Sequence, residues 1–288
     1  MFVKIAQGGM TTMPEIFQYD FMRKAFVVGI IIGIITPCIG IIIVLKRFSM
    51  IGDALSHSSL AGVTAGLVAG INPVLGAVLF SVIASLGIEK FRKSFSNYSE
   101  IAVAIITSTA IGLAGILSGF IKNSASFTSF LFGSIVAISN FELYMIVLLG
   151  IIVILCSIFL YKELFYMIFD EESARLSGIP VNLINFVFML LTAITVSIST
   201  RTVGALIISS LMILPVAISM QLAKSYKNTL TFAVIIGVFS TVFGLVMSYY
   251  GDLKPGGTIV LVNVVILVCI LVFKNIQKNF QNYNRKNI

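Results

Sequence analysis

The 288-residue chain is too apolar and too sparsely charged for a water-soluble enzyme. Hydrophobic residues make up 58% of it and charged residues 10%, against about 25% charged in an ordinary globular domain. The formal net charge of +8 does not indicate nucleic-acid binding, because the basic residues lie at the ends of apolar segments and form no basic face with interleaved aromatic residues. The composition predicts a membrane protein.

Nine apolar segments are long enough to cross a bilayer as helices, since a span needs roughly 20 residues. They cover residues 21–45, 51–71, 74–89, 101–121, 140–161, 183–199, 203–222, 229–249 and 257–274. We therefore predict an all-α fold with a single transmembrane domain over residues 21–275. Residues 1–20 lack the basic start and apolar core of a cleavable signal peptide. They are expected to form an extracytoplasmic leader, and residues 276–288 a cytoplasmic basic tail.

The basic residues predict the orientation of the spans. They gather after odd-numbered spans, such as Lys46 and Arg47 after the first and Lys274 after the ninth. The positive-inside bias then places the N-terminus outside and the C-terminus in the cytoplasm, with Arg23 and Lys24 as the one discordant pair. An odd number of spans excludes a duplication of two equal halves, so any symmetry of a transport path would come from a second copy of the chain.

The second span contains the sequence Gly52-Asp53-Ala54-Leu55-Ser56-His57, with the only histidine of the chain. Asp53 and His57 are four residues apart and so lie on one face of a helix, where they can hold one divalent cation between them. Ionisable groups in a membrane span are costly and indicate function. Three interpretations stay open: a metal path, a proton relay, and a structural hydrogen bond between helices. The ligand types suit manganese, iron(II) or zinc better than copper(I).

The same span carries a stripe of small residues, Ser58, Gly62, Gly66 and Gly70. Small residues at this spacing allow another helix to approach closely. The stripe lies about 100° around the helix from the line through Asp53. We therefore expect one face of this helix to pack while the neighbouring face carries the polar pair.

Nothing in the sequence predicts a permanently bound cofactor. Cys38, Cys156 and Cys269 lie singly in apolar segments without CxxC spacing, and are interpreted as small buried residues rather than zinc or redox ligands. The phosphate-binding pattern G-x-x-x-x-G-K-[ST] is missing from the sequence. The chain is therefore not expected to hydrolyse ATP itself.

The loop after the fifth span predicts a short polar helix on the cytoplasmic face. Asp170 can cap it, Glu171 and Glu172 supply an acidic first turn, Gly178 can end it, and Pro180 prevents its continuation. Two interpretations remain open for this segment, an ordinary interfacial connector and a docking helix for a cytoplasmic partner.

Taken together, these segments resemble the permease subunits of ATP-binding-cassette importers for zinc, manganese or iron. The resemblance runs from about residue 17 to 275, and Ser58 and Ser59 stand where the family usually has small apolar residues. Its motifs are Lys46-Arg47 followed by Gly52 to His57, the segment Asp170 to Gly178, the stretches Val203 to Leu206 and Leu214 to Ala217, and Pro255 to Leu261.

The resemblance implies a fold like that of the cobalamin and siderophore permeases with the first of their ten helices absent. It also implies a homodimer with the path on its axis, two cytoplasmic ATP-binding subunits and an external metal-binding protein, all at a bacterial plasma membrane. Asp53 and His57 carry over as the metal-coordinating pair, with the metal as transported substrate. The residues that would couple to the ATPase are Asp170, Glu171, Glu172, Ala174, Arg175 and Gly178.

A secondary transporter with a proton-coupled Asp53–His57 pair, and a scaffolding membrane protein, are the competing functions. The first would need no docking helix. In the second, the pair would join two helices by a hydrogen bond.

Overall fold

The computed structural model describes residues 16, 18–94, 99–121, 124–133 and 138–286, and their regular structure is entirely helical. Residues 1–15 and 17 of the expected leader lie outside this part of the chain. The helices are α1 (Asp20–Leu45), α2 (Met50–Ala69), α3 (Pro73–Ser94), α4 (Ser99–Ser118), α5 (Ser124–Phe132), α6 (Asn140–Phe159), α7 (Tyr161–Phe169), α8 (Glu171–Leu176), α9 (Val181–Val203), α10 (Ala205–Leu222), α11 (Tyr226–Gly251) and α12 (Pro255–Lys286).

Each of the nine predicted spans corresponds to one long helix, which confirms the predicted fold class. Eight of these helices, within the described residues, are long and apolar enough to cross a membrane. The ninth is α2, which is less apolar because its first half contains Asp53, His57 and three serines. Helices α3, α4, α9 and α10 all pack against α2, so the protein itself surrounds most of this polar helix.

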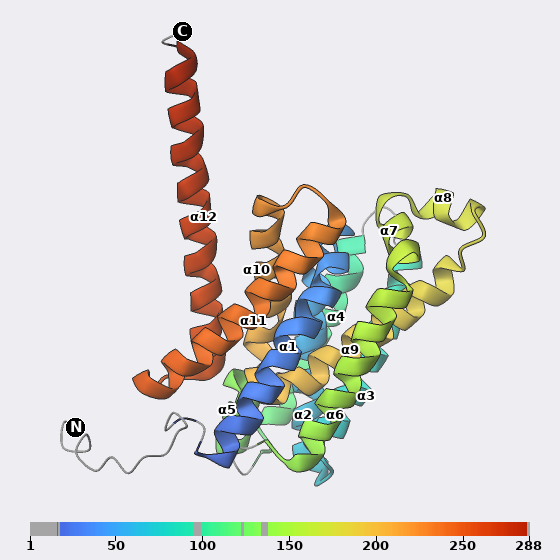
Figure 1. The fold of residues 1–288 in the computed structure, drawn as a ribbon. Coiled ribbons are helices and arrows are strands. Elements are labelled where there is room, and N and C mark those ends of the chain that lie inside the picture. The colour runs from blue at the N-terminus through green and yellow to red at the C-terminus, as the bar shows by residue number, and fades with distance from the viewer. Residues whose placement is uncertain (1–15, 17, 95–98, 122–123, 134–137, 287–288) are drawn as a thin grey trace, which may run out of the picture.

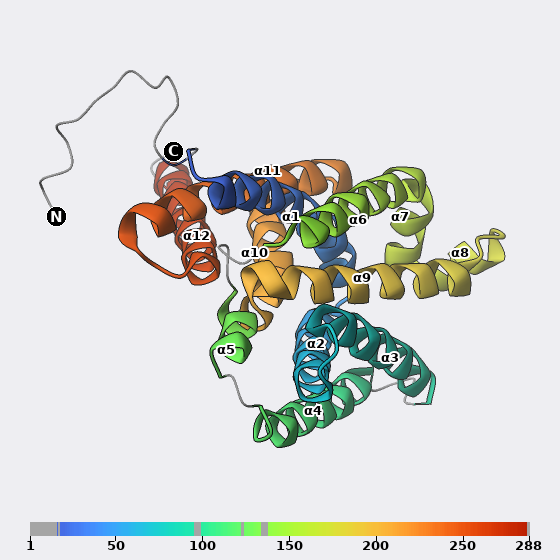
Figure 2. The same ribbon diagram turned by 90° about the horizontal axis from the view of Figure 1, so that it is seen from below.

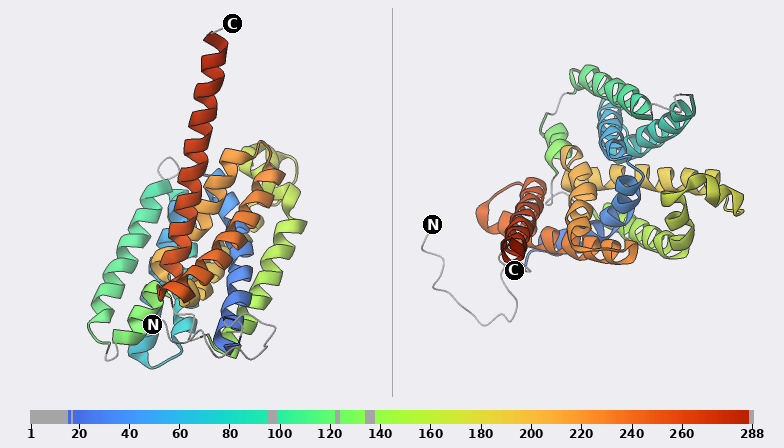
Figure 3. Two further views of the ribbon diagram at one scale, coloured as in Figure 1. Left: turned by 60° about the vertical axis from the view of Figure 1, so that its left-hand side comes forward. Right: turned by 90° about the horizontal axis from the view of Figure 1, so that it is seen from above.

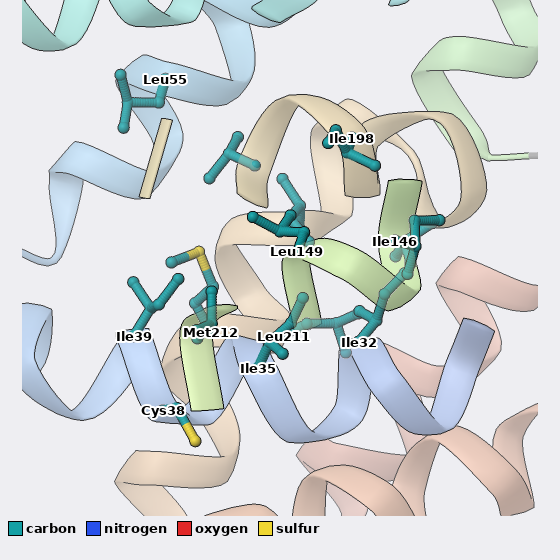
Figure 4. Packing of buried hydrophobic residues seen from close by; sticks show 14 of the residues in the cluster. Ile32, Ile35, Cys38, Ile39, Leu55, Ile146, Leu149, Ile198, Leu211 and Met212 are labelled. Carbon is teal, nitrogen blue, oxygen red and sulfur yellow. The ribbon is translucent and has the colours of Figure 1, made fainter. Parts of the chain in front are cut away.

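The long helices form two groups on either side of α9 (Figures 1 and 2). Helices α2, α3 and α4 pack together on one side, and α1, α6 and α11 on the other, while α10 contacts both groups. The main apolar cluster joins them (Figure 4): Ile35 comes from α1, Leu55 from α2, Leu149 from α6 and Met212 from α10.

Short helices mark the two ends of the bundle. Helices α7 and α8 lie at one end, where α1 finishes, and α5 lies at the other (Figure 1). We refer to these as the α8 end and the α5 end. Helix α8 was predicted, whereas α5 and α7 were not. Helix α12 leaves the bundle and extends past the α8 end (Figure 3). The segment expected to be a separate tail continues this helix as far as Lys286.

Glycines set the closest contact between α2 and α3. A β-carbon on Gly62 would lie 2.1 Å from the carbonyl oxygen of Gly76, and one on Gly76 would lie 2.3 Å from that of Gly62. A β-carbon on Gly66 would meet Pro73 at 2.9 Å. Gly70 differs, since it ends α2 with a φ of 70° and has open space around it. Side chains larger than hydrogen at Gly62 and Gly66 would therefore separate α2 from α3.

The α5 end is fixed by a tight turn and an ion pair. Gly204, with a φ of 105°, is the single residue between α9 and α10. Arg201 was expected in a loop but belongs to the last turn of α9. Its Nε lies 3.3 Å from Oε1 of Glu142 at the start of α6, and its guanidinium carbon lies 4.6 Å from the ring centre of Phe130 in α5. Arg201 therefore ties α5, α6 and α9 together.

We predict that Gly62→Ala destabilises the protein, while Gly112→Ala does not. Gly112 lies in α4, where a β-carbon meets nothing within 4 Å, so alanine should be neutral or stabilising by up to about 1 kcal/mol. At Gly62 the added methyl group overlaps backbone of α3, and such overpacking costs about 1–3 kcal/mol. Thermal unfolding of the detergent-solubilised variants checks this difference. Equal unfolding temperatures for the two variants would contradict it.

Candidate functional site

Asp53 and His57 lie in the first half of α2, close to its start at Met50. A four-residue turn connects α1 to α2, and Phe48 N–H donates back to the carbonyl of Ile43 at 2.8 Å across it. Asp53 is thus in the first turn of its helix, where the positive end of the helix dipole favours a carboxylate. The site therefore lies nearer to the α8 end of the bundle than to the α5 end.

The two side chains face each other along α2, as the four-residue spacing predicts. His57 Nε2 lies 3.7 Å from Asp53 Oδ2, which is too long for a direct hydrogen bond. Two ligands that each lie ~2.1 Å from one metal ion in tetrahedral geometry are separated by ~3.4 Å. A small side-chain rotation would therefore let both atoms bind one ion. Both residues belong to α2, so the pair makes no hydrogen bond between helices.

The pair stays accessible on the first half of a helix whose middle is buried in the bundle. The Asp53 side chain is 39% exposed and that of His57 is 20% exposed. Beside them, Gly52 faces Ser209 and Met212 of α10. Among the residues that the structure describes, no group of three or more His, Cys, Asp and Glu side chains could hold a metal ion. In this part of the chain, Asp53 and His57 thus supply one carboxylate and one imidazole ligand, without a third His, Cys, Asp or Glu beside them.

Small hydroxyl groups hold α2 in place behind the pair. Ser59 Oγ lies 3.4 Å from Thr200 Oγ1 of α9, and Ser81 of α3 donates to the carbonyl oxygen of Leu55 at 3.1 Å. The structure thus gives Ser59 a buried hydrogen-bonding role. These contacts fix the orientation of α2 around its axis, and with it the direction in which Asp53 and His57 face.

Helix α8 is capped at both ends by the predicted residues. The Asp170 carboxylate accepts hydrogen bonds from the N–H groups of Glu172 and Ser173 at 3.1 and 3.0 Å. The hydrogen bonds of its side chain, chiefly from Ser173, lower the pKa of Asp170. At the other end Gly178 has a φ of 85°, and Ile179 N–H donates to the carbonyl of Ala174. This is the Schellman arrangement, in which glycine is favoured.

The two faces of α8 have opposite surroundings. Ala174 is 2% exposed and packs into an apolar cluster formed by α1, α7, α9, α10 and α11. Leu176 is 85% exposed, and Glu172 and Arg175 are exposed beside it. The outer face of α8 thus presents one apolar side chain between charged residues.

Glu171 points back into the helical bundle, which the sequence did not reveal. Its carboxylate contacts Lys46, the first residue after α1, and Asn185 of α9. Burial is the main cause that lowers the pKa of Lys46, and Glu171 acts against it. From the sequence, Lys46 contributed to the predicted orientation of the spans and to the family motif, and Asn185 had no assigned role. An Asn at the start of an apolar helical segment was the available signal, but the contact joins residues 139 positions apart.

The chain is similar to membrane proteins of several metal transport systems. A probable metal transport system membrane protein of Treponema pallidum is 38% identical over 256 residues, covering 88% of this chain and 96% of the relative. A manganese transport system membrane protein, MntC, of Listeria monocytogenes is 32% identical over 92% of this chain and 94% of its own. A high-affinity zinc uptake system membrane protein, ZnuB, of Haemophilus influenzae is 28% identical, covering 87% and 97%.

A solved structure shares the fold. PsaBC from Streptococcus pneumoniae, in complex with Fab, contains a chain that superposes with a TM-score of 0.79 at 27% identity, covering 88% of this chain and 92% of that one. The family model described as the ABC 3 transport family matches residues 18–274. That match spans the whole described helical bundle up to the middle of α12, and the chain belongs to the ABC 3 transport family.

Proposed function

We propose that the chain is the membrane-spanning permease subunit of an ATP-driven importer that carries a divalent transition metal into the cytoplasm. The observation that carries the proposal is the accessible Asp53–His57 pair on a helix that packs against α3, α4, α9 and α10. Family membership and relatives named for manganese and zinc transport support it. ATP hydrolysis is assigned to separate cytoplasmic subunits, because the sequence lacks the phosphate-binding loop.

The incomplete ligand set suits passage of an ion better than its storage. A carboxylate and an imidazole per chain leave most coordination positions to other groups, so the ion is held without a closed cage. A path needs binding that is favourable enough for entry and weak enough for release. Carboxylate and imidazole ligands suit manganese, iron(II) and zinc, so the substrate is proposed as a member of this group.

A second copy of the chain would complete the path. Helix α12 is largely exposed along its apolar side chains, including Leu261, Val265, Val268 and Val272. Most of the apolar face of α4 is exposed as well. In the proposed homodimer, helices of the partner cover part of these faces, and the two Asp53–His57 pairs supply four ligands. An external metal-binding protein delivers the ion, with the N-terminus outside and the C-terminus in the cytoplasm of a bacterial cell.

Helix α8 is proposed as the docking element for an ATP-binding subunit. The residues assigned to this role are Asp170, Glu171, Glu172, Ala174, Arg175 and Gly178. Three observations support this role: both ends of the helix are capped, Ala174 is buried, and Glu172 and Arg175 are exposed on the outer face, where a partner could contact them. A secondary transporter would have no use for such a helix.

We expect Asp53→Ala and His57→Ala each to abolish ATP-dependent metal uptake while leaving the protein folded, because the pair lies away from the Gly62–Gly76 contact. Val68→Ala is the matched control, since Val68 is an exposed residue of the same helix. Uptake of radioactive manganese or zinc by cells that carry each variant measures the effect. Uptake at the wild-type rate in His57→Ala cells would show that the ion does not pass this pair.

We expect Leu176→Asp to weaken binding of the ATP-binding subunit, because an exposed apolar contact becomes a charge. The few residues that dominate an interface contribute about 2 kcal/mol or more each, so affinity should fall by about thirtyfold if Leu176 is one of them. Leu253→Asp is the control, since Leu253 is 56% exposed and lies between α11 and α12, away from α8. Co-purification of the two subunits measures the difference. Equal recovery for both variants would rule out Leu176 as part of the docking face.

A further inference from the structure

A buried ammonium group joins three segments at the α8 end. The Lys46 side chain is 8% exposed, and its Nζ lies 2.8 Å from Oδ1 of Asn185 and 3.6 Å from Oε2 of Glu171. Asn185 in turn donates from Nδ2 to Oε1 of Glu171 at 3.3 Å. The three side chains form a closed triad, which connects the end of α1, the first turns of α9 and the first residue of α8.

Such a triad resists separation more strongly than an apolar contact would. Pulling Glu171 away leaves a buried charge on Lys46 with one partner fewer, and unpaired buried charges are strongly unfavourable. The other inward residue of α8, Ala174, has only a methyl group in an apolar cluster, where sliding costs little. The triad is therefore the directional connection between α8 and the helices behind it.

A short segment of the chain connects the triad to the Asp53–His57 pair. From Lys46 the chain turns through Arg47, which has a φ of 60° where glycine is usual. Phe48 closes the turn by its hydrogen bond to Ile43, and Ile51 N–H donates to Phe48 at 2.9 Å. Helix α2 starts within this network, and Asp53 is seven residues after Lys46. A displacement of Lys46 can therefore be transmitted to Asp53 through a short, hydrogen-bonded segment of the chain.

We propose that Lys46, with Glu171 and Asn185, passes the movement of α8 to the α1–α2 turn and so changes the position of the Asp53–His57 pair. The inference rests on the proposed function, in which α8 receives the motion of the ATP-binding subunit. Lys46 is a positioning residue, since it contacts neither the ion nor the nucleotide. Replacing the Lys46 side chain should leave the subunits assembled. ATP hydrolysis should then continue while less metal is transported.

The test uses the whole importer in proteoliposomes, with its ATP-binding subunit and metal-binding protein, and manganese or zinc as the probe. Lys46→Met retains the apolar stem of the side chain and removes the charge. We expect ATP-binding subunits to co-purify as with wild type and ATP hydrolysis to continue. Metal moved per ATP hydrolysed should fall about tenfold, within the range typical of coupling between two sites. Glu171→Gln, at a side chain 38% exposed, should act in the same direction without endangering folding.

A double charge reversal separates coupling from simple structural damage. In Lys46→Glu/Glu171→Lys, a rotation of the Asn185 amide by 180° lets its nitrogen donate to the new carboxylate and its oxygen accept from the new ammonium. The double variant should recover most of the metal moved per ATP, while each single reversal should not. Lys24→Glu, at a partly exposed ion pair with Asp20 at the other end of α1, should transport normally.

Several outcomes would overturn the proposed coupling role of Lys46. These are wild-type coupling in Lys46→Met, loss of the ATP-binding subunit from that variant, or a double reversal no better than the single ones. A wild-type complex that shows no ATP-dependent metal uptake would instead refute the proposed function. The wild-type measurement therefore distinguishes the two failures.

Discussion

Close backbone approach is the constraint on which the rest of this structure depends. In a bilayer, apolar side chains gain little by leaving lipid for protein, so helices associate through packing and interhelical hydrogen bonds. Here the Gly62–Gly76 contact brings α2 against α3, and Ser59 and Ser81 bond α2 to its neighbours. These contacts hold a helix with a carboxylate and an imidazole within an apolar bundle, with both groups partly exposed.

The proposed mechanism combines rigid helix ends with a metal-ligand set that is incomplete within one chain. Helix α8 is made rigid by two caps, and the α5 end is fixed by Arg201 with Glu142 and Phe130. The Asp53–His57 pair, in contrast, has too few ligands for a closed site. In the proposed alternating-access cycle, motion applied at the α8 end must change the geometry of the Asp53–His57 pair without unfolding the helices. Rigid helix ends and an incompletely liganded pair suit this requirement. The Lys46 triad is the bonded connection between the two.

The sequence predicted the features that depend on local pattern. The long spans follow from apolar length, and the caps of α8 follow from Asp170 and Gly178. The sequence did not predict α5 and α7, because helices of nine residues have too few turns to give a clear period. Nor could it place Glu171 against Lys46 or Arg201 against Glu142, since these pairs join residues far apart in the chain. The exposure of Leu176 likewise depends on how α8 is anchored through Ala174.

The length of α12 limits how cytoplasmic subunits can assemble on this protein. Its 32 residues extend for about 48 Å at 1.5 Å per residue, well beyond a hydrocarbon core of about 30 Å. The excess stands past the α8 end as a rod (Figure 3), with Lys274 and Lys278 along it. In the proposed importer, a subunit that docks on α8 would share this end of the bundle with the protruding part of α12 (Figures 1 and 3), so its shape would have to accommodate that helix.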